Sequence, residues 1–353
     1  MMDATRNNNF GALRLIFASL VLYSHTPQMI HGSRKYEILY YIFGNLTLAE
    51  IAVDAFFIIS GYLITQSFEN SSSVWSYSKK RVLRIFPGYL VVFWICVLIV
   101  APLAGAGLSG FNVSTALTGL LANIRLMPPN GFAVFPGLPF PSLNGSLWTI
   151  AYEFRCYIIV LIAGSSGLLS ERYKIVFPLV AAFLLSINAL EIIPKIEFPG
   201  SSIIGYPRDD VRFFGLFVCG MTFYLYRARI YYRHWTASLS AACLLVGMTN
   251  RITAEASFAI FGGYMIFWAA FRVKALLPSV FTASFDISYG VYLYAWPVQS
   301  IIIYYVSRDS FVVSLISSAI VAVIAFASWF VIERPALDFA RRQTQSRRAQ
   351  SAE

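Results

Sequence analysis

Long apolar runs recur along the whole chain, and they constrain its fold more than any other feature. A helix needs about 20 apolar residues to cross a bilayer. Runs of this length, separated by short polar segments, predict ten transmembrane helices. We place them at 10–30, 47–67, 83–104, 146–168, 173–193, 206–226, 232–249, 254–272, 284–306 and 309–332. The range 206–226 is the least regular because four charged residues crowd its start, and 114–127 is expected to form a further short or re-entrant helix.

The composition supports a single membrane domain. Hydrophobic residues make up 58% of the 353-residue chain and charged residues only 12%, whereas a soluble domain carries roughly 25% charged residues. We therefore expect an all-α integral membrane protein, with a transmembrane domain at 1–340 and a basic cytoplasmic tail at 341–353. The first apolar run lacks a small-residue cleavage site, so we interpret it as a retained span rather than a signal peptide.

The basic residues indicate the orientation. If the N-terminus lies inside, 18 of the 27 Lys and Arg residues fall in inner segments, eight in outer segments and Arg155 within a span. Inner loops of membrane proteins are enriched in this way, so both termini are expected in the cytoplasm, with the chain in the inner (cytoplasmic) membrane. The same clusters account for the net charge of +10, and no nucleic acid partner is expected.

No metal site is expected. The four cysteines lie in apolar runs without metal-ligand spacing, and His31 and His234 lie in loops without it. The longest connection, 105–145, is rich in Gly and Pro and is predicted to lie outside. Loops of this length are usually functional. We therefore place an acceptor-binding role at its end, with Asn144 and Trp148.

Two ionisable residues lie in the first span, where such groups are costly. Arg14 and His25 are 11 residues apart, which is about three helical turns and roughly 16 Å along one face. The functional interpretation is an anion anchor at the cytoplasmic mouth and a general base deeper in the membrane. The alternative is an Arg that extends to the interface and a hydrogen-bonded structural His.

A catalytic His needs a partner that orients it. Asp54 in the second span lies at a similar depth to His25, and a carboxylate bonded to one ring nitrogen fixes the tautomer. Glu153 in the fourth span is the rival partner. The alternatives are that Asp54 is satisfied at a helix end and that Glu153 pairs with Arg155.

Arg81 and Arg84 follow the second span on the inner side, three residues apart. If this segment is helical, they share a face. Arginine forks bind phosphates, so they are candidates for the phosphates of coenzyme A. The alternative is that they only set the topology.

At these residues the chain resembles the acyltransferase-3 family of bacterial membrane carbohydrate acyltransferases. Its first helix carries a basic residue, ten residues and then His, as Arg14 and His25 do here. The further matching segments are V-D-x-F-F-x-x-S-G-[FY] at 53–62, R-x-x-R-I-x-P at 81–87, L-W-[ST]-x-x-x-E at 147–153, the tyrosine-rich YGVYLYAWPV and the terminal IERP. They occur in order along the whole chain.

The resemblance implies about ten helices, an acetyl-CoA donor and a sugar hydroxyl as acceptor. It implies that His25 is catalytic and that Arg14, Arg81 and Arg84 are essential or contact the donor. We also place Tyr62 among the donor-binding residues; many members have Phe there. Many members carry a fused esterase-like domain; this chain is expected to lack one and to serve its acceptor directly or through a separate partner.

The sequence therefore predicts a membrane enzyme that transfers an acyl group, by default acetyl, from cytoplasmic acyl-CoA to a surface glycan or glycolipid. His25 acts as general base or through an acyl-histidine. The alternatives are a glycan or lipid transporter (a flippase) without acyl chemistry, and a glycan polymerase or ligase. The sequence names neither the acceptor nor the oligomeric state.

Overall fold

The computed structural model describes residues 8–106, 113–194, 205–274, 276, 285–340 and 342. These residues form helices joined by loops, with no β-strand among them. Four of the described helices are long and apolar enough to cross a membrane: Leu48–Glu69, Val74–Leu103, Arg251–Arg272 and Ser310–Ala340. The all-helical class is thus confirmed for this part of the chain, whereas the count of ten spans and the side of the termini stay predictions.

Helices coincide with all ten predicted ranges. They are α1 (Phe10–His31), α3 (Leu48–Glu69), α4 (Val74–Ile95), α7 (Trp148–Ser165), α8 (Val176–Ala189), α10 (Pro207–Leu225), α11 (His234–Gly247), α12 (Arg251–Ser257) with α13 (Gly263–Arg272), α14 (Ser288–Tyr305) and α15 (Ser310–Ser328). Three short helices also occur: α2 (Ile38–Phe43), α5 (Ala101–Leu103) and α6 (Val113–Ile124). The last of these agrees with the short helix predicted at 114–127.

Some boundaries differ from the prediction. α4 begins at Val74, well before the predicted start at 83, so Arg81 lies on the same helix as Arg84. The helix that begins at Ser310 continues to Ala340, beyond the predicted end at 332. Within the long connection, 107–112 lies outside the described residues, as does most of the predicted tail.

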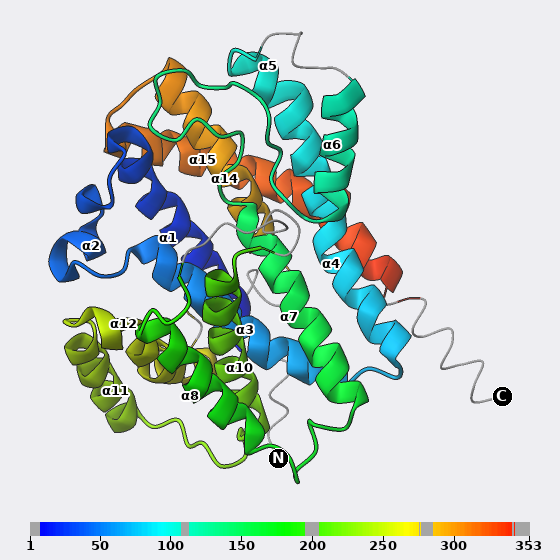
Figure 1. The fold of residues 1–353 in the computed structure, drawn as a ribbon, viewed down its shortest axis with the longest axis vertical. Helices are drawn as coiled ribbons and strands as arrows, with labels where there is room; N and C mark the ends of the chain where they lie inside the picture. The colour runs from blue at the N-terminus through cyan, green and yellow to red at the C-terminus, as the bar shows by residue number, and fades with distance from the viewer. Residues whose placement is uncertain are drawn as a thin grey trace. The chain divides into compact units, whose positions relative to one another are not determined.

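The chain divides into two compact units. The first comprises the described parts of Met1–Phe17, Ile38–Val74 and Arg155–Asp286. In it α10 packs against both α3 and α8 (Figure 1). A Cβ added to Gly61 on α3 would lie 2.0 Å from the carbonyl oxygen of Phe217, and one on Gly220 of α10 would lie 2.0 Å from that of Ile58. Glycine therefore lets the two backbones touch where these helices cross.

The second unit comprises the described parts of Ala18–Glu37, Trp75–Phe154 and Ile287–Glu353. In it α14 packs along α15 (Figure 1), and Gly290 allows the approach because an added Cβ would meet Ala325 at 3.0 Å. The YGVYLYAWPV motif lies entirely on α14, and most of its side chains are buried. This helix therefore contributes to the core of the unit.

Candidate active site

His25 lies in the half of α1 that belongs to the second unit. Its imidazole is half-buried and meets the ring of Trp296 on α14 edge to face, with 5.2 Å between the ring centroids. Trp296 is itself only 8% exposed. The imidazole thus contacts a buried side chain of its own unit, and its role as a catalytic base stays a prediction.

The end of the long connection is bound to α14 through Asn144. This side chain is 1% exposed, and its amide donates to the carbonyl oxygen of Leu293 at 2.8 Å. Pro297, four residues after Leu293, has no backbone N–H to offer that carbonyl. Asn144 therefore supplies the missing donor, and its predicted contact with substrate stays a prediction.

Trp148 and Glu153 lie on the first turns of α7. The Trp148 side chain is 36% exposed and meets Tyr152 edge to face at 5.6 Å. Between them in sequence, the Thr149 hydroxyl lies 2.6 Å from that of Tyr292 on α14. Glu153 is half-buried. This end of α7 thus carries an exposed Trp148 ring and, one residue on, a partly buried pair of hydroxyl groups.

The arginines of α4 lie near the terminal motif. Arg84 Nη1 is 3.8 Å from Glu333 Oε2 of the IERP motif, and its guanidinium lies 5.5 Å from the ring centroid of Tyr289. Tyr289 in turn donates to the carbonyl of Ile85 at 2.9 Å. Two motifs that are far apart in sequence therefore meet at Arg84, while Arg81 lies over the ring of Tyr77.

The first unit holds Arg14 and Tyr62. Arg14 Nη1 lies 2.6 Å from Asp286 Oδ2, with side chains 21% and 9% exposed. The sequence analysis missed Asp286, whose signal is a lone carboxylate near the start of the ninth predicted span, 284–306. Tyr62 is 6% exposed and packs against Phe10 and Phe267, with ring centroids 5.7 and 4.8 Å away. It is part of an aromatic core.

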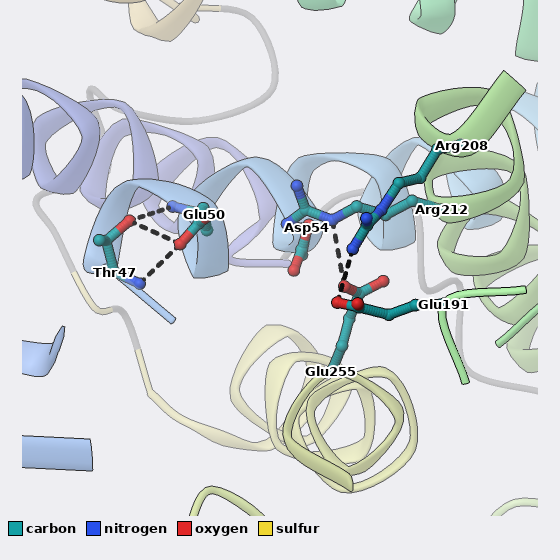
Figure 2. A network of polar contacts seen from close by, with 7 residues as sticks. All are labelled: Thr47, Glu50, Asp54, Glu191, Arg208, Arg212 and Glu255. Carbon is teal, nitrogen blue, oxygen red and sulfur yellow. Dashed lines mark hydrogen bonds and ion pairs between the residues drawn. The ribbon is translucent and has the colours of Figure 1, made fainter. Parts of the chain in front are cut away.

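Asp54 is the centre of a charged network in the first unit (Figure 2). Its side chain is fully buried, and Oδ1 lies 2.7 Å from Arg212 Nη2 on α10. Arg212 Nε also lies 3.2 Å from Glu255 Oε2 on α12. One arginine thus serves two buried carboxylates from two other helices. A pairing of Asp54 with His25 stays a prediction.

The network explains the irregular start of the sixth predicted span. Each of three charges there has a partner from another element: Arg208 pairs with Glu191 at 2.8 Å, Asp210 with Arg155 at 2.5 Å, and Arg212 with the two carboxylates above. The cost of placing these groups in an apolar helix is offset by pairing. Arg155, which was considered as a partner for Glu153, is therefore engaged by Asp210.

Among the described residues, no group of three or more His, Cys, Asp or Glu side chains is placed to hold a metal ion. The sequence analysis also missed Trp296 and Gln299. Gln299 had a signal, because it is a lone amide in a long apolar run. The fold and these residues define a membrane-type helical protein with a half-buried histidine on α1, an exposed ring at the start of α7 and arginines on α1 and α4.

This chain belongs to the acyltransferase-3 family, whose acyltransferase domain matches residues 7–334. An O-acetyl transferase of Shigella phage Sf6 is 29% identical over 340 residues, which cover 93% of this chain and 96% of that protein. Nodulation protein 10 of Rhizobium leguminosarum bv. viciae is 26% identical over 372 residues, covering 94% and 93%. Acyltransferase MdmB of Streptomyces mycarofaciens is 31% identical over 112 residues, covering 32% and 27%. No solved structure matches the chain.

Proposed function

We propose that this acyltransferase is a membrane O-acyltransferase that transfers an acyl group, with acetyl as the expected case, from acyl-CoA to a hydroxyl of a surface glycan or glycolipid. Membership of the family over nearly the whole chain supports acyl transfer. The phage relative, an O-acetyl transferase at 29% identity, supports acetyl and an oxygen acceptor. We further propose an inner-membrane location with ten spans and both termini in the cytoplasm.

In the proposed mechanism, His25 removes the proton from the acceptor hydroxyl as its oxygen attacks the thioester carbonyl. The C–O bond forms, the tetrahedral intermediate collapses, and the C–S bond breaks. The coenzyme A thiolate then takes the proton back from the imidazolium, so no net proton is gained or lost. Such general base catalysis contributes typically 10²–10⁴-fold. The orienting carboxylate is Asp54 or Glu153.

The donor and acceptor are proposed to arrive from opposite sides. The phosphates of acyl-CoA are anionic, and Arg14, Arg81 and Arg84 are the cations proposed to bind them from the predicted cytoplasmic side. Tyr62 belongs to the aromatic core on that side. At the other end, the exposed ring of Trp148 suits the apolar face of a sugar. Asn144 contributes to acceptor binding by fixing the end of the 105–145 connection to α14.

The observation that carries the proposal is the family match over residues 7–334, a range that contains His25. We expect His25→Ala to abolish transfer of radiolabel from acetyl-CoA to glycan in isolated membranes, because the base is lost. The matched control is His31→Ala on the last turn of the same helix, where the imidazole stacks on Tyr36 at 4.2 Å, and this variant should retain transfer.

The same assay separates the alternatives. Glycan that crosses the membrane without gaining label would support a transporter, and longer unlabelled chains would support a polymerase. Mass spectrometry of surface glycans from a deletion strain identifies the acceptor by the missing acetyl increment. Full turnover by His25→Ala would contradict the assignment of the base.

A further inference from the structure

The turn of α1 that carries His25 is interrupted by a proline. Pro27 lies inside the helix, two residues after His25. It has no backbone N–H, so the carbonyl of Tyr23 loses its usual donor and the helix is free to bend there. The position of the imidazole therefore depends on contacts from outside α1.

Gln299 of α14 supplies one such contact. Its side chain is fully buried, and Nε2 donates to the carbonyl oxygen of Leu22 at 2.8 Å and to the Thr26 hydroxyl at 2.6 Å. Leu22, His25 and Thr26 are spaced by three and four residues, so they share one face of the helix. Gln299 thus forms hydrogen bonds to a backbone carbonyl one turn before His25 and to the side chain of the residue directly after it.

Trp296 supplies a second contact, one turn earlier on α14. Its ring meets the His25 imidazole, and its Nε1 donates to the carbonyl of Ser142 at 3.3 Å. On the loop side, a Cβ added to Gly145 would lie 2.5 Å from the ring. The indole is therefore held between the end of the long connection and the imidazole.

We propose that Gln299 and Trp296 are positioning residues that set the height and rotamer of His25 for acyl transfer. This inference rests on the proposed function, because it requires His25 to be the base. Neither side chain needs to touch the substrate. The hydrogen bonds of Gln299 fix the conformation of α1 where Pro27 permits it to bend. The ring of Trp296 packs against one side of the imidazole and limits its rotamers. A displacement of a catalytic group by about 1 Å can slow catalysis by about 100-fold. The contacts of Gln299 and Trp296 would therefore be needed for turnover.

The decisive variant is Gln299→Met, which keeps the side-chain length and removes the amide donors. We expect kcat to fall about 10–100-fold, while the KM for acyl-CoA stays within about twofold because binding of the donor is not altered. Thr26→Val removes one of the two acceptors of the Gln299 amide and leaves the Leu22 carbonyl, so kcat should fall in the same direction but by less. Because Gln299→Met already removes the bond to Thr26, the double variant should be little worse than Gln299→Met alone.

The matched control is Ser300→Ala. Ser300 is the next residue on α14 and is also fully buried, and its hydroxyl has no hydrogen-bond partner among the residues that the structure describes. This variant should retain the wild-type kcat. Gly145→Ala tests the contact between Trp296 and His25 without a substitution in either helix. The added methyl group would displace the indole of Trp296, while the sequences of α1 and α14 stay unchanged. It should lower kcat, again with little change in KM.

The outcomes separate this inference from the proposed function. If Gln299→Met and Thr26→Val keep the wild-type kcat while His25→Ala is inactive, Gln299 is not a positioning residue, and the proposed function still holds. Transfer that survives His25→Ala would overturn both. If the loss came only from poor folding, the active fraction would fall in step with the monodisperse fraction in detergent, and the folded protein would turn over normally, which also contradicts the proposal.

Discussion

Arg212 is the residue that balances the most buried charge in the first unit. It is the shared partner of Asp54 and Glu255, whose side chains are 0% and 13% exposed. Removing one member of a buried ion network leaves uncompensated charge and costs about 3–5 kcal/mol. We therefore expect Arg212→Ala to lower the free energy of unfolding by about that amount, measured by denaturant titration in detergent micelles.

Arg208→Ala is the control for this prediction. It lies one turn earlier on α10, but its partner Glu191 is 40% exposed, and exposed ion pairs contribute less than about 1 kcal/mol. A second test removes all three charges at once with Arg212→Met, Asp54→Asn and Glu255→Gln. That variant should recover most of the lost stability. If it is no more stable than Arg212→Ala, buried charge is not the cause.

At this scale the sequence singled out ionisable residues in the apolar runs but did not predict the partners that the structure gives them. His25 and Asp54 stand out because ionisable groups are rare in apolar runs. The partner of Asp54 lies 158 residues away on another helix, and matching two residues by depth says nothing about the direction in which each side chain points. Gln299 was overlooked because an uncharged amide gives a weaker signal than a charge.

The contact between α3 and α10 depends on a pair of glycines. A Cβ on Gly220 would lie 2.0 Å from the Ile58 carbonyl oxygen, and a backbone atom cannot move aside as a side chain can. The helices must therefore separate, and small-to-large changes of this kind cost typically about 1–3 kcal/mol. We expect Gly220→Ala to lower the unfolding midpoint in denaturant.

Gly119→Ala on α6 is the matched substitution. Its added Cβ would meet only the ring of Phe93, at 3.9 Å, which is an ordinary contact. Because alanine favours a helix by about 1 kcal/mol over glycine, this variant should be neutral or slightly more stable. Equal effects at both positions would mean that the loss at Gly220 arises from something other than the close approach of the two backbones.

Hydropathy placed the helices well but several of their ends poorly. Apolar length predicts where a helix crosses a membrane, whereas a helix continues until its backbone hydrogen bonds are interrupted. Nothing between Val74 and Ile85 breaks the helix, so α4 extends through the basic segment that was expected to be a loop. After α15, a π-helical turn at Trp329–Glu333 precedes Pro335, and the helix continues to Ala340, beyond the predicted end at 332.

The orientation of the chain in the membrane decides whether the arginines proposed to bind acyl-CoA face the cytoplasm. The predicted topology puts the loop between α3 and α4 inside and the 105–145 connection outside. Ser72 and Asn130 are exposed residues of these two segments. We expect a cysteine at Asn130→Cys to react with a membrane-impermeant maleimide in intact cells, and one at Ser72→Cys to react only after the membrane is opened.

The native cysteines give little background in this experiment, because Cys96, Cys156 and Cys219 are buried and Cys243 is half-buried. The parent chain without either substitution provides the baseline. Labelling of Ser72→Cys in intact cells would put Arg81 and Arg84, which follow on the next helix, on the side away from cytoplasmic acyl-CoA. The donor would then have to enter elsewhere, and the role proposed for these arginines would fail even if His25 proved essential.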